Sequence, residues 1–159
     1  MNARLVRALV AWSLLVGVAG ALIRSGSAPA SASKAPSYVV TTQNMSGLGV
    51  ILVDGAGQAL YAYGPDHHSG RSKCNSACAD EWPPLLLPKG VTTPISSGKA
   101  KASLLGTTKR IGGSTQVTYN GWPLYRFATD ETPGSAPGEG LDNLGGYWYV
   151  LSAKGKEVR

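Results

Sequence analysis

A chain of 159 residues has room for one ordinary domain. Its 21 glycines, seven tyrosines and four tryptophans favour strands and tight turns, and no segment after the N-terminal region shows a long apolar period of 3.6 residues. Three of the 15 basic residues lie in the first 24 positions and the other basic residues are scattered, so the composition excludes a nucleic-acid-binding surface.

The N-terminal region has the pattern of a targeting segment. Arg4 and Arg7 precede an uncharged apolar run over residues 8–23, and small residues with A-x-A sites follow up to residue 32. This order predicts a secretory signal peptide over residues 1–32 and a linker over 33–37, which places the rest of the chain outside the cytoplasm. An uncleaved anchor is the alternative, and the chain contacts a membrane only in that case. The apolar run is shorter than the ~20 residues that span a bilayer, which argues against the anchor.

The next segments predict a first group of strands. Residues 38–43 are β-branched, residues 49–53 are continuously apolar, and residues 58–63 follow a turn at 54–57 as the second arm of a hairpin. Residues 64–81 form a long polar loop that holds both histidines and both cysteines. The Trp-Pro-Pro run at 82–84 imposes extended backbone, because each proline disfavours helical backbone in the preceding residue.

A second group of strands is predicted after residue 104. Residues 107–111, 114–119 and 122–127 indicate a meander with turns at 112–113 and at Asn120-Gly121, a pair typical of tight hairpins. A second long loop covers residues 129–146, a strand follows at 147–152, and residues 154–159 are expected to form a tail.

The two groups contain the same motif. The segment LYAYGPD returns 64 residues later as LYRFATD, and a tryptophan follows each copy. The matched residues are Leu60, Tyr61, Tyr63, Asp66 and Trp82 in the first copy and Leu124, Tyr125, Phe127, Asp130 and Trp148 in the second. A duplicated unit of this kind predicts an all-β domain over residues 38–153, a small sandwich or barrel made of two pseudo-symmetric repeats at 47–88 and 104–153.

The doubled motif carries a family resemblance. Together with the CNSACADEWPPLL segment, it resembles the bacterial secreted repeat family of unknown function, whose members are described as predicted lipoproteins with a Y-x-[FWY]-x-x-D motif. The resemblance implies an extracytoplasmic, envelope-located protein and implies no activity. The chain departs from many members because no cysteine precedes Cys74, so it lacks the residue to which a lipid is attached.

Cys74 and Cys78 are the only cysteines. An even pair in an oxidising compartment predicts a disulfide, and a separation of four residues allows one. A metal centre is the alternative, because His67, His68, Cys74 and Cys78 lie close together in the sequence and two thiolates with two imidazoles suit zinc or copper.

The remaining motif residues have structural and functional interpretations. Asp66 and Asp130 could face each other as a catalytic pair, but an aspartate at the end of a strand commonly accepts backbone hydrogen bonds, and we expect that role. The repeated aromatic residues are expected in the core. Trp122 and Tyr147 have no aromatic counterpart in the first copy, so we expect them to form an exposed ligand surface.

No catalytic or cofactor-binding signature occurs in the sequence. We therefore expect a non-enzymatic binding or scaffolding protein without a cofactor, whose partner is a cell-envelope component or a small ligand. The alternative is a metal- or haem-linked extracytoplasmic redox accessory that uses the loop with His67, His68, Cys74 and Cys78.

Overall fold

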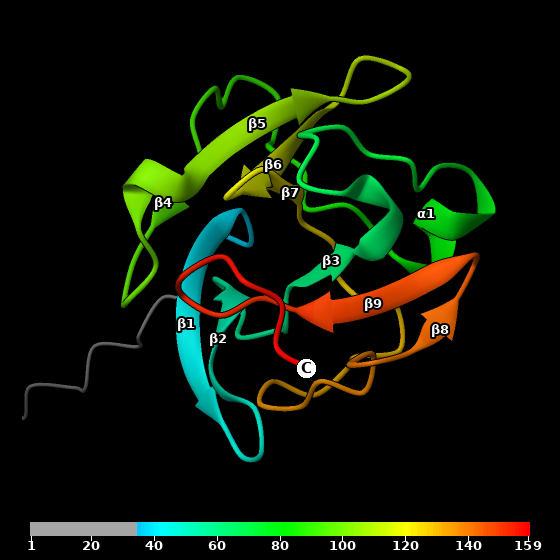
Figure 1. Ribbon diagram of the computed structural model, residues 1–159. Helices are drawn as coiled ribbons and strands as arrows, with labels where there is room; N and C mark the ends of the chain where they lie inside the picture. Colours follow the sequence, from blue (N-terminus) through cyan, green and yellow to red (C-terminus); the bar gives the residue numbers. More distant parts are fainter. Residues whose placement is uncertain (1–34) are drawn as a thin grey trace, which may run out of the picture. The chain divides into compact units, whose positions relative to one another are not determined.

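The computed structural model describes residues 35–159, in which the strands form three small sheets (Figure 1). The first sheet has the order β2-β1-β4, with β1 at Val39–Met45, β2 at Gly49–Asp54 and β4 at Ile95–Ser96. The second has the order β3-β9-β8, with β3 at Tyr61–Tyr63, β8 at Asp142–Asn143 and β9 at Gly146–Val150. The third has the order β5-β6-β7, with β5 at Leu105–Lys109, β6 at Thr115–Tyr119 and β7 at Trp122–Pro123.

In the part of the chain that the structure describes, helical structure is limited to short segments. The 3-10 helices are η1 at Gly64–Asp66 and η2 at Ala102–Leu104, and the α-helix α1 at Ala77–Glu81 lies within the segment expected to be a loop. Over residues 35–159 no helix is long and apolar enough to cross a membrane. The predicted signal peptide over residues 1–32 lies outside the described residues.

The expectation of a mainly β domain is confirmed, and so is the three-strand meander of the second repeat. Its turn at Asn120-Gly121 has φ values of 49° and 78°, as a tight hairpin turn with two left-handed residues requires. The first hairpin is only partly as expected. Leu60 still donates its N–H to Leu52, but β3 then leaves β2 and pairs with β9 (Figure 1).

A pseudo-twofold relation connects the two repeats at Tyr61 and Tyr125. The N–H of each tyrosine donates to the carbonyl of the other, at 2.9 and 3.0 Å, in an isolated antiparallel bridge. The N–H of Leu60 donates to Leu52 at 3.1 Å, and the N–H of Leu124 donates to Val117 at 3.0 Å. Equivalent residues of the two copies therefore make equivalent backbone bonds.

The repeats also exchange strands. The motif strand of the first repeat pairs with β9 of the second, where Tyr63 lies opposite Trp148. The motif segment of the second repeat pairs with the Trp82 segment of the first, where Arg126 donates its N–H to the carbonyl of Pro83. Neither repeat has its complete set of strand partners alone, which gives a physical reason for the duplication, since a lone hairpin is marginally stable at best.

Two layers of core lie on opposite sides of the motif strands, because successive side chains of a strand point in opposite directions. The aliphatic layer contains Leu60, Leu124, Leu52, Val117, Leu85 and Leu151. The aromatic layer contains Tyr61, Tyr63, Tyr125, Trp82 and Trp148. The alternation within the motif therefore places its leucines in one layer and its aromatic residues in the other.

The C-terminal residues belong to the fold, so the expectation of a tail over residues 154–159 is wrong. The chain turns back after Ser152, and the N–H of Val158 donates to the carbonyl of Val150 at 3.0 Å. An antiparallel bridge joins Leu151 to Glu157. The last residues thus lie beside the end of β9, which brings their side chains to the site described next.

Candidate functional site

The two motif aspartates are buried and hold the ends of the motif in place. Asp66 accepts a hydrogen bond from the Tyr125 hydroxyl at 2.7 Å and another from the Lys73 N–H at 2.8 Å. Asp130 accepts one from Ser135 at 2.9 Å and lies 3.4 Å from the Tyr61 hydroxyl. Each aspartate therefore bonds to the motif tyrosine of the other repeat. Asp66 also accepts a backbone hydrogen bond, the role expected for both acids, whereas the two bonds of the Asp130 carboxylate come from side chains.

Burial is the largest influence on the pKa values of these groups. It raises the pKa of Asp66 above its usual value, although the hydrogen bonds from Tyr125 and Lys73 act in the opposite direction. Burial likewise raises the pKa of Asp130. The pKa values of Tyr61 and Tyr125 are raised too, chiefly by burial and next by the neighbouring aspartates, so both hydroxyls are neutral donors.

The repeated aromatic residues form one stack in the core. Trp82 and Trp148 lie face to face with ring centroids 3.9 Å apart, Phe127 stacks on Trp82 at 4.3 Å, and Tyr63 stacks on Trp148 at 4.3 Å. Both tryptophans are fully buried. Trp82, Trp148 and Tyr63 thus pack the core, and Phe127 at the end of the stack is partly exposed.

Cys74 and Cys78 form a disulfide at the start of α1, with Cα atoms 5.2 Å apart. The carbonyl of Cys74 accepts a hydrogen bond of 2.6 Å from Arg110, which joins this loop to the second repeat. The alternative of a thiolate-containing metal centre does not fit, because the disulfide withdraws both thiolates. Within residues 35–159, no group of three or more metal-binding side chains converges.

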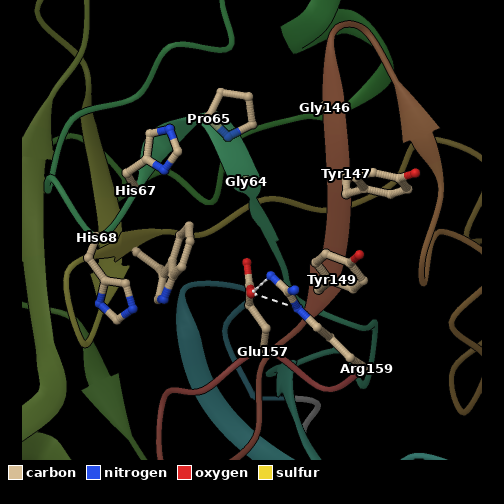
Figure 2. Close-up of a pocket in the computed structure, with 10 residues that line it drawn as sticks. Gly64, Pro65, His67, His68, Gly146, Tyr147, Tyr149, Glu157 and Arg159 are labelled. Carbon is tan, nitrogen blue, oxygen red and sulfur yellow. Dashed lines mark hydrogen bonds and ion pairs between the residues drawn. The ribbon is translucent and has the colours of Figure 1, made fainter.

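A hollow of about 680 Å³ lies between the loop that follows the first motif and the outer face of β9 (Figure 2). His67 and Pro65 stand on one side, Tyr147 and Tyr149 stand on the other, and Glu157 lies between them with its partner Arg159. Its volume is within the range of ligand-binding clefts, about 300–1,000 Å³.

Two glycines let the sides of the hollow approach each other. A Cβ atom on Gly146 would lie 2.5 Å from Cδ of Pro65, and one on Gly64 would lie 3.3 Å from the carbonyl oxygen of Tyr147. Larger residues would force η1 away from β9. The glycines of the GPD and GGY segments thus permit the contact that forms the floor.

His67 and His68 hold an uncommon backbone conformation at the rim of this hollow. Their φ values are 49° and 51°, in the left-handed region that costs non-glycine residues energy. The N–H of His67 bonds to the carbonyl of Gly64 at 3.2 Å, and Nδ1 of His68 lies 2.8 Å from the carbonyl of Asn120. Gly121 makes room for this loop, because a Cβ atom there would lie 2.8 Å from the carbonyl oxygen of His68.

Trp122 was expected to be exposed, and this expectation is wrong. The ring of His68 lies 4.4 Å from that of Trp122 by centroids, and only 5% of Trp122 is exposed. The imidazole therefore covers the indole, which forms the inner side of the hollow. Tyr147 is 50% exposed and faces solvent.

Besides Gly64, Pro65 and Gly146, the sequence reasoning missed three lining residues: Tyr149, Glu157 and Arg159. The alternation of the YWYV segment places Tyr149 on the same face as Tyr147, and this signal was present in the sequence. Glu157 and Arg159 had no such signal, because the C-terminal turn that brings them here is a long-range feature.

The charges of the hollow are paired. Nη2 of Arg159 lies 2.6 Å from a carboxylate oxygen of Glu157. The guanidinium carbon lies 4.8 Å from the centroid of the Tyr149 ring, a cation–π arrangement. A cation and an anion of the lining thus compensate each other, and aromatic surface remains beside them.

A second hollow, of about 730 Å³, lies between residues 87–92 and the β5–β6 turn. Its lining contains glycine, threonine and lysine and has no aromatic side chain. It also lacks left-handed non-glycine residues such as His67 and His68 at the first hollow, so we regard the first as the candidate site.

Comparison with known proteins agrees with the doubled architecture. A family model described as a secreted repeat of unknown function matches residues 44–86 and again residues 106–152, together more than half of the chain. Each match contains one motif and its tryptophan. Neither a search of curated proteins nor a search of solved structures found a match.

Proposed function

Because the chain belongs to the family of secreted repeats of unknown function, we propose that it is a non-enzymatic binding module of the extracytoplasmic space. Its binding site is the hollow between His67 and Tyr147, and its ligand is a cell-envelope component or a small molecule. The description of the family as secreted supports the location outside the cytoplasm.

The observation that carries this proposal is that the hollow is lined by residues the duplicated fold does not require. By strand pairing, Glu81 and Pro83 are the first-repeat counterparts of Tyr147 and Tyr149. The two motif copies thus build the same core although the outer faces of their tryptophan-bearing segments differ. The tyrosine pair adds exposed aromatic area to one repeat, where it contributes little to packing.

The strained histidines point the same way. Glu131 and Thr132 occupy the places of His67 and His68 in the second copy, and neither has a positive φ. Backbone strain is concentrated at functional sites more than elsewhere, because folding alone does not select for it. At these matched positions only the first copy has left-handed non-glycine residues, and they lie beside the hollow, which supports a role for this loop in binding.

The lining supports binding more than catalysis. Among the residues around the hollow, Glu157 is the single carboxylate, and it is ion-paired with Arg159. Hydrolysis of a glycosidic bond by the usual mechanism needs two carboxyl groups about 5–9.5 Å apart. No nucleophile with a neighbouring base lines the hollow, which is the arrangement that covalent catalysis needs.

Retention on an insoluble cell-envelope fraction tests the proposal. The purified protein should co-sediment with this fraction, and the double substitution of Tyr147 and Tyr149 by alanine should reduce co-sedimentation at least fivefold. Ile111→Ala is the matched control, because Ile111 is 86% exposed and lies at the distant β5–β6 turn. Equal retention of the double variant and the control would contradict the proposal. No retention of the unaltered protein would exclude an envelope component as the ligand and leave a small molecule.

A further inference from the structure

We propose that the ligand of this hollow is a glycan chain, with neutral sugar rings lying against Tyr147 and Tyr149. This inference rests on the proposed function and names the chemical class of the ligand. It is argued from the geometry of the tyrosine pair, from the polar groups beside it and from the balance of charge.

The tyrosine pair offers two aromatic rings and two hydroxyls on one face of β9, with Tyr147 half-exposed. Tyr147 and Tyr149 project from the same face of β9, with ring centroids 5.9 Å apart and planes within 20° of parallel (Figure 2). A sugar ring has a face of C–H groups and a rim of hydroxyls. A tyrosine matches both, because its ring is apolar and its hydroxyl can hydrogen-bond.

Polar groups surround this surface at the positions where a sugar rim would lie. The His67 imidazole and the hydroxyls of Tyr147 and Tyr149 form no side-chain hydrogen bond with any other residue of the 35–159 region. Two guanidinium nitrogens of Arg159 donate to Glu157, and Nη1 keeps its N–H groups for a ligand oxygen. Donors and acceptors are thus mixed, as ligand hydroxyls require.

The charge of the lining favours a neutral ligand. Arg159 is the single Lys or Arg side chain around the hollow, and Glu157 already compensates it. Recognition of phosphate-rich ligands depends on uncompensated cationic groups, usually several of them. A phospholipid headgroup or a nucleotide therefore matches this surface less well than a neutral sugar chain.

The strained loop gives the site one fixed side. His68 is held on Trp122 and on the carbonyl of Asn120, so its neighbour His67 is presented from a rigid turn. A preorganised hydrogen-bonding group opposite an aromatic surface lowers the ordering cost of binding. We therefore expect the imidazole of His67 to form a hydrogen bond with a hydroxyl of the sugar ring that lies against the tyrosines.

Titration with soluble tetrasaccharides tests the inference. Cellotetraose, chitotetraose and maltotetraose are added separately to the purified protein, and binding is followed by calorimetry and by amide chemical shifts. At least one of the three should bind with a Kd between about 1 µM and 1 mM and should shift the signals of His67 and Tyr149. Tyr147→Ala should weaken this binding about tenfold, because the stacking surface is lost.

Two further variants distinguish the contribution of the Tyr147 ring to binding from that of its hydroxyl and from a nonspecific effect of substitution. Tyr147→Phe keeps the ring and should bind within about threefold of the unaltered protein, since one neutral hydrogen bond is lost. Ile111→Ala should leave the affinity unchanged. The thermal midpoint of every variant is measured alongside, so that a loss of binding in a folded protein is identified as such.

The outcomes distinguish this inference from the broader proposal. If no tetrasaccharide binds, or if Tyr147→Ala binds as well as the unaltered protein, the glycan assignment is overturned. It is also overturned if phosphatidylglycerol vesicles or hemin bind through Tyr147 while the sugars do not. In that case, or if tyrosine-dependent retention on the envelope fraction persists without sugar binding, the binding-module proposal stands alone.

Discussion

Replacement of Tyr125 by phenylalanine removes one buried hydroxyl and leaves the aromatic ring in place. That hydroxyl donates to Asp66 over 2.7 Å and lies 2.7 Å from Oγ of Ser72. The same replacement at Tyr61 is its matched control, because Tyr61 occupies the same position in the other repeat. Its hydroxyl lies 3.4 Å from the carboxylate of Asp130, at the long limit of a hydrogen bond.

These distances predict unequal costs for the same chemical change. A hydrogen bond to a charged, buried group contributes about 1.5–3 kcal/mol, and the loss of the Tyr125 hydroxyl leaves Asp66 with the bond from the Lys73 N–H. We therefore expect Tyr125→Phe to lower the free energy of unfolding by about 2 kcal/mol. Tyr61→Phe should lower it by less than about 1 kcal/mol, because the hydroxyl's two hydrogen bonds, to Asp130 at 3.4 Å and from the Gly138 N–H at 3.3 Å, are both long and weak.

Urea unfolding at neutral pH, followed by tryptophan fluorescence, measures both values. A two-state fit with equal m values for the three proteins shows that only the stability has changed. Equal destabilisation by the two substitutions would refute the reasoning, because it would mean that the geometry of the Tyr–Asp contact does not determine its contribution. A cost for Tyr125→Phe below about 0.5 kcal/mol would refute it as well.

Three further predictions concern the motif acid, the glycine turn and the disulfide. Burial raises the pKa of Asp66, so the folded state binds its proton more tightly than the unfolded state. The unaltered protein should therefore gain stability relative to Asp66→Asn as the pH falls from 7 towards 4. A pH-independent difference between the urea midpoints of the two proteins would contradict this. Gly121→Ala should destabilise the fold by at least about 1 kcal/mol more than Gly112→Ala. Both glycines have positive φ, but only at Gly121 would a Cβ atom meet the carbonyl of His68. Similar costs of the two substitutions in urea unfolding would count against the described turn. Reduction of the disulfide should lower the free energy of unfolding by about 2 kcal/mol, as its short loop implies, and a cost above about 4 kcal/mol would show a larger role in the fold.

Much of the architecture is predictable from local patterns. The doubled motif, the alternation within it and the Asn120-Gly121 turn all act over a few residues, so they indicate strands, faces and turns directly from the chain. The same patterns correctly place Tyr61 and Tyr125 in the core. Packing alone explains why both copies keep aromatic residues, because four of these rings stack on one another in the core and only Phe127, at the end of the stack, is partly exposed.

The pairing between the repeats depends on contacts that no local pattern contains. The first hairpin was expected to continue through residue 63, but β3 pairs with β9. The sequence of β3 is equally suited to either partner, because both would bury the same alternate residues. The choice is made by the packing of Trp148 on Tyr63 and of Trp82 on Phe127, which pairs residues more than 40 positions apart.

The amino-acid sequence alone was sufficient to show a duplicated β unit with buried motif residues, because periodicity and turn chemistry are local properties. Only the tertiary structure showed that His67, Tyr149, Glu157 and Arg159 border one hollow. Four separate segments, including the one with Trp122, meet there through the exchange of strands between repeats and the return of the C-terminal residues along β9. Such meetings arise from long-range packing energies, which the order of residues along a single segment does not express.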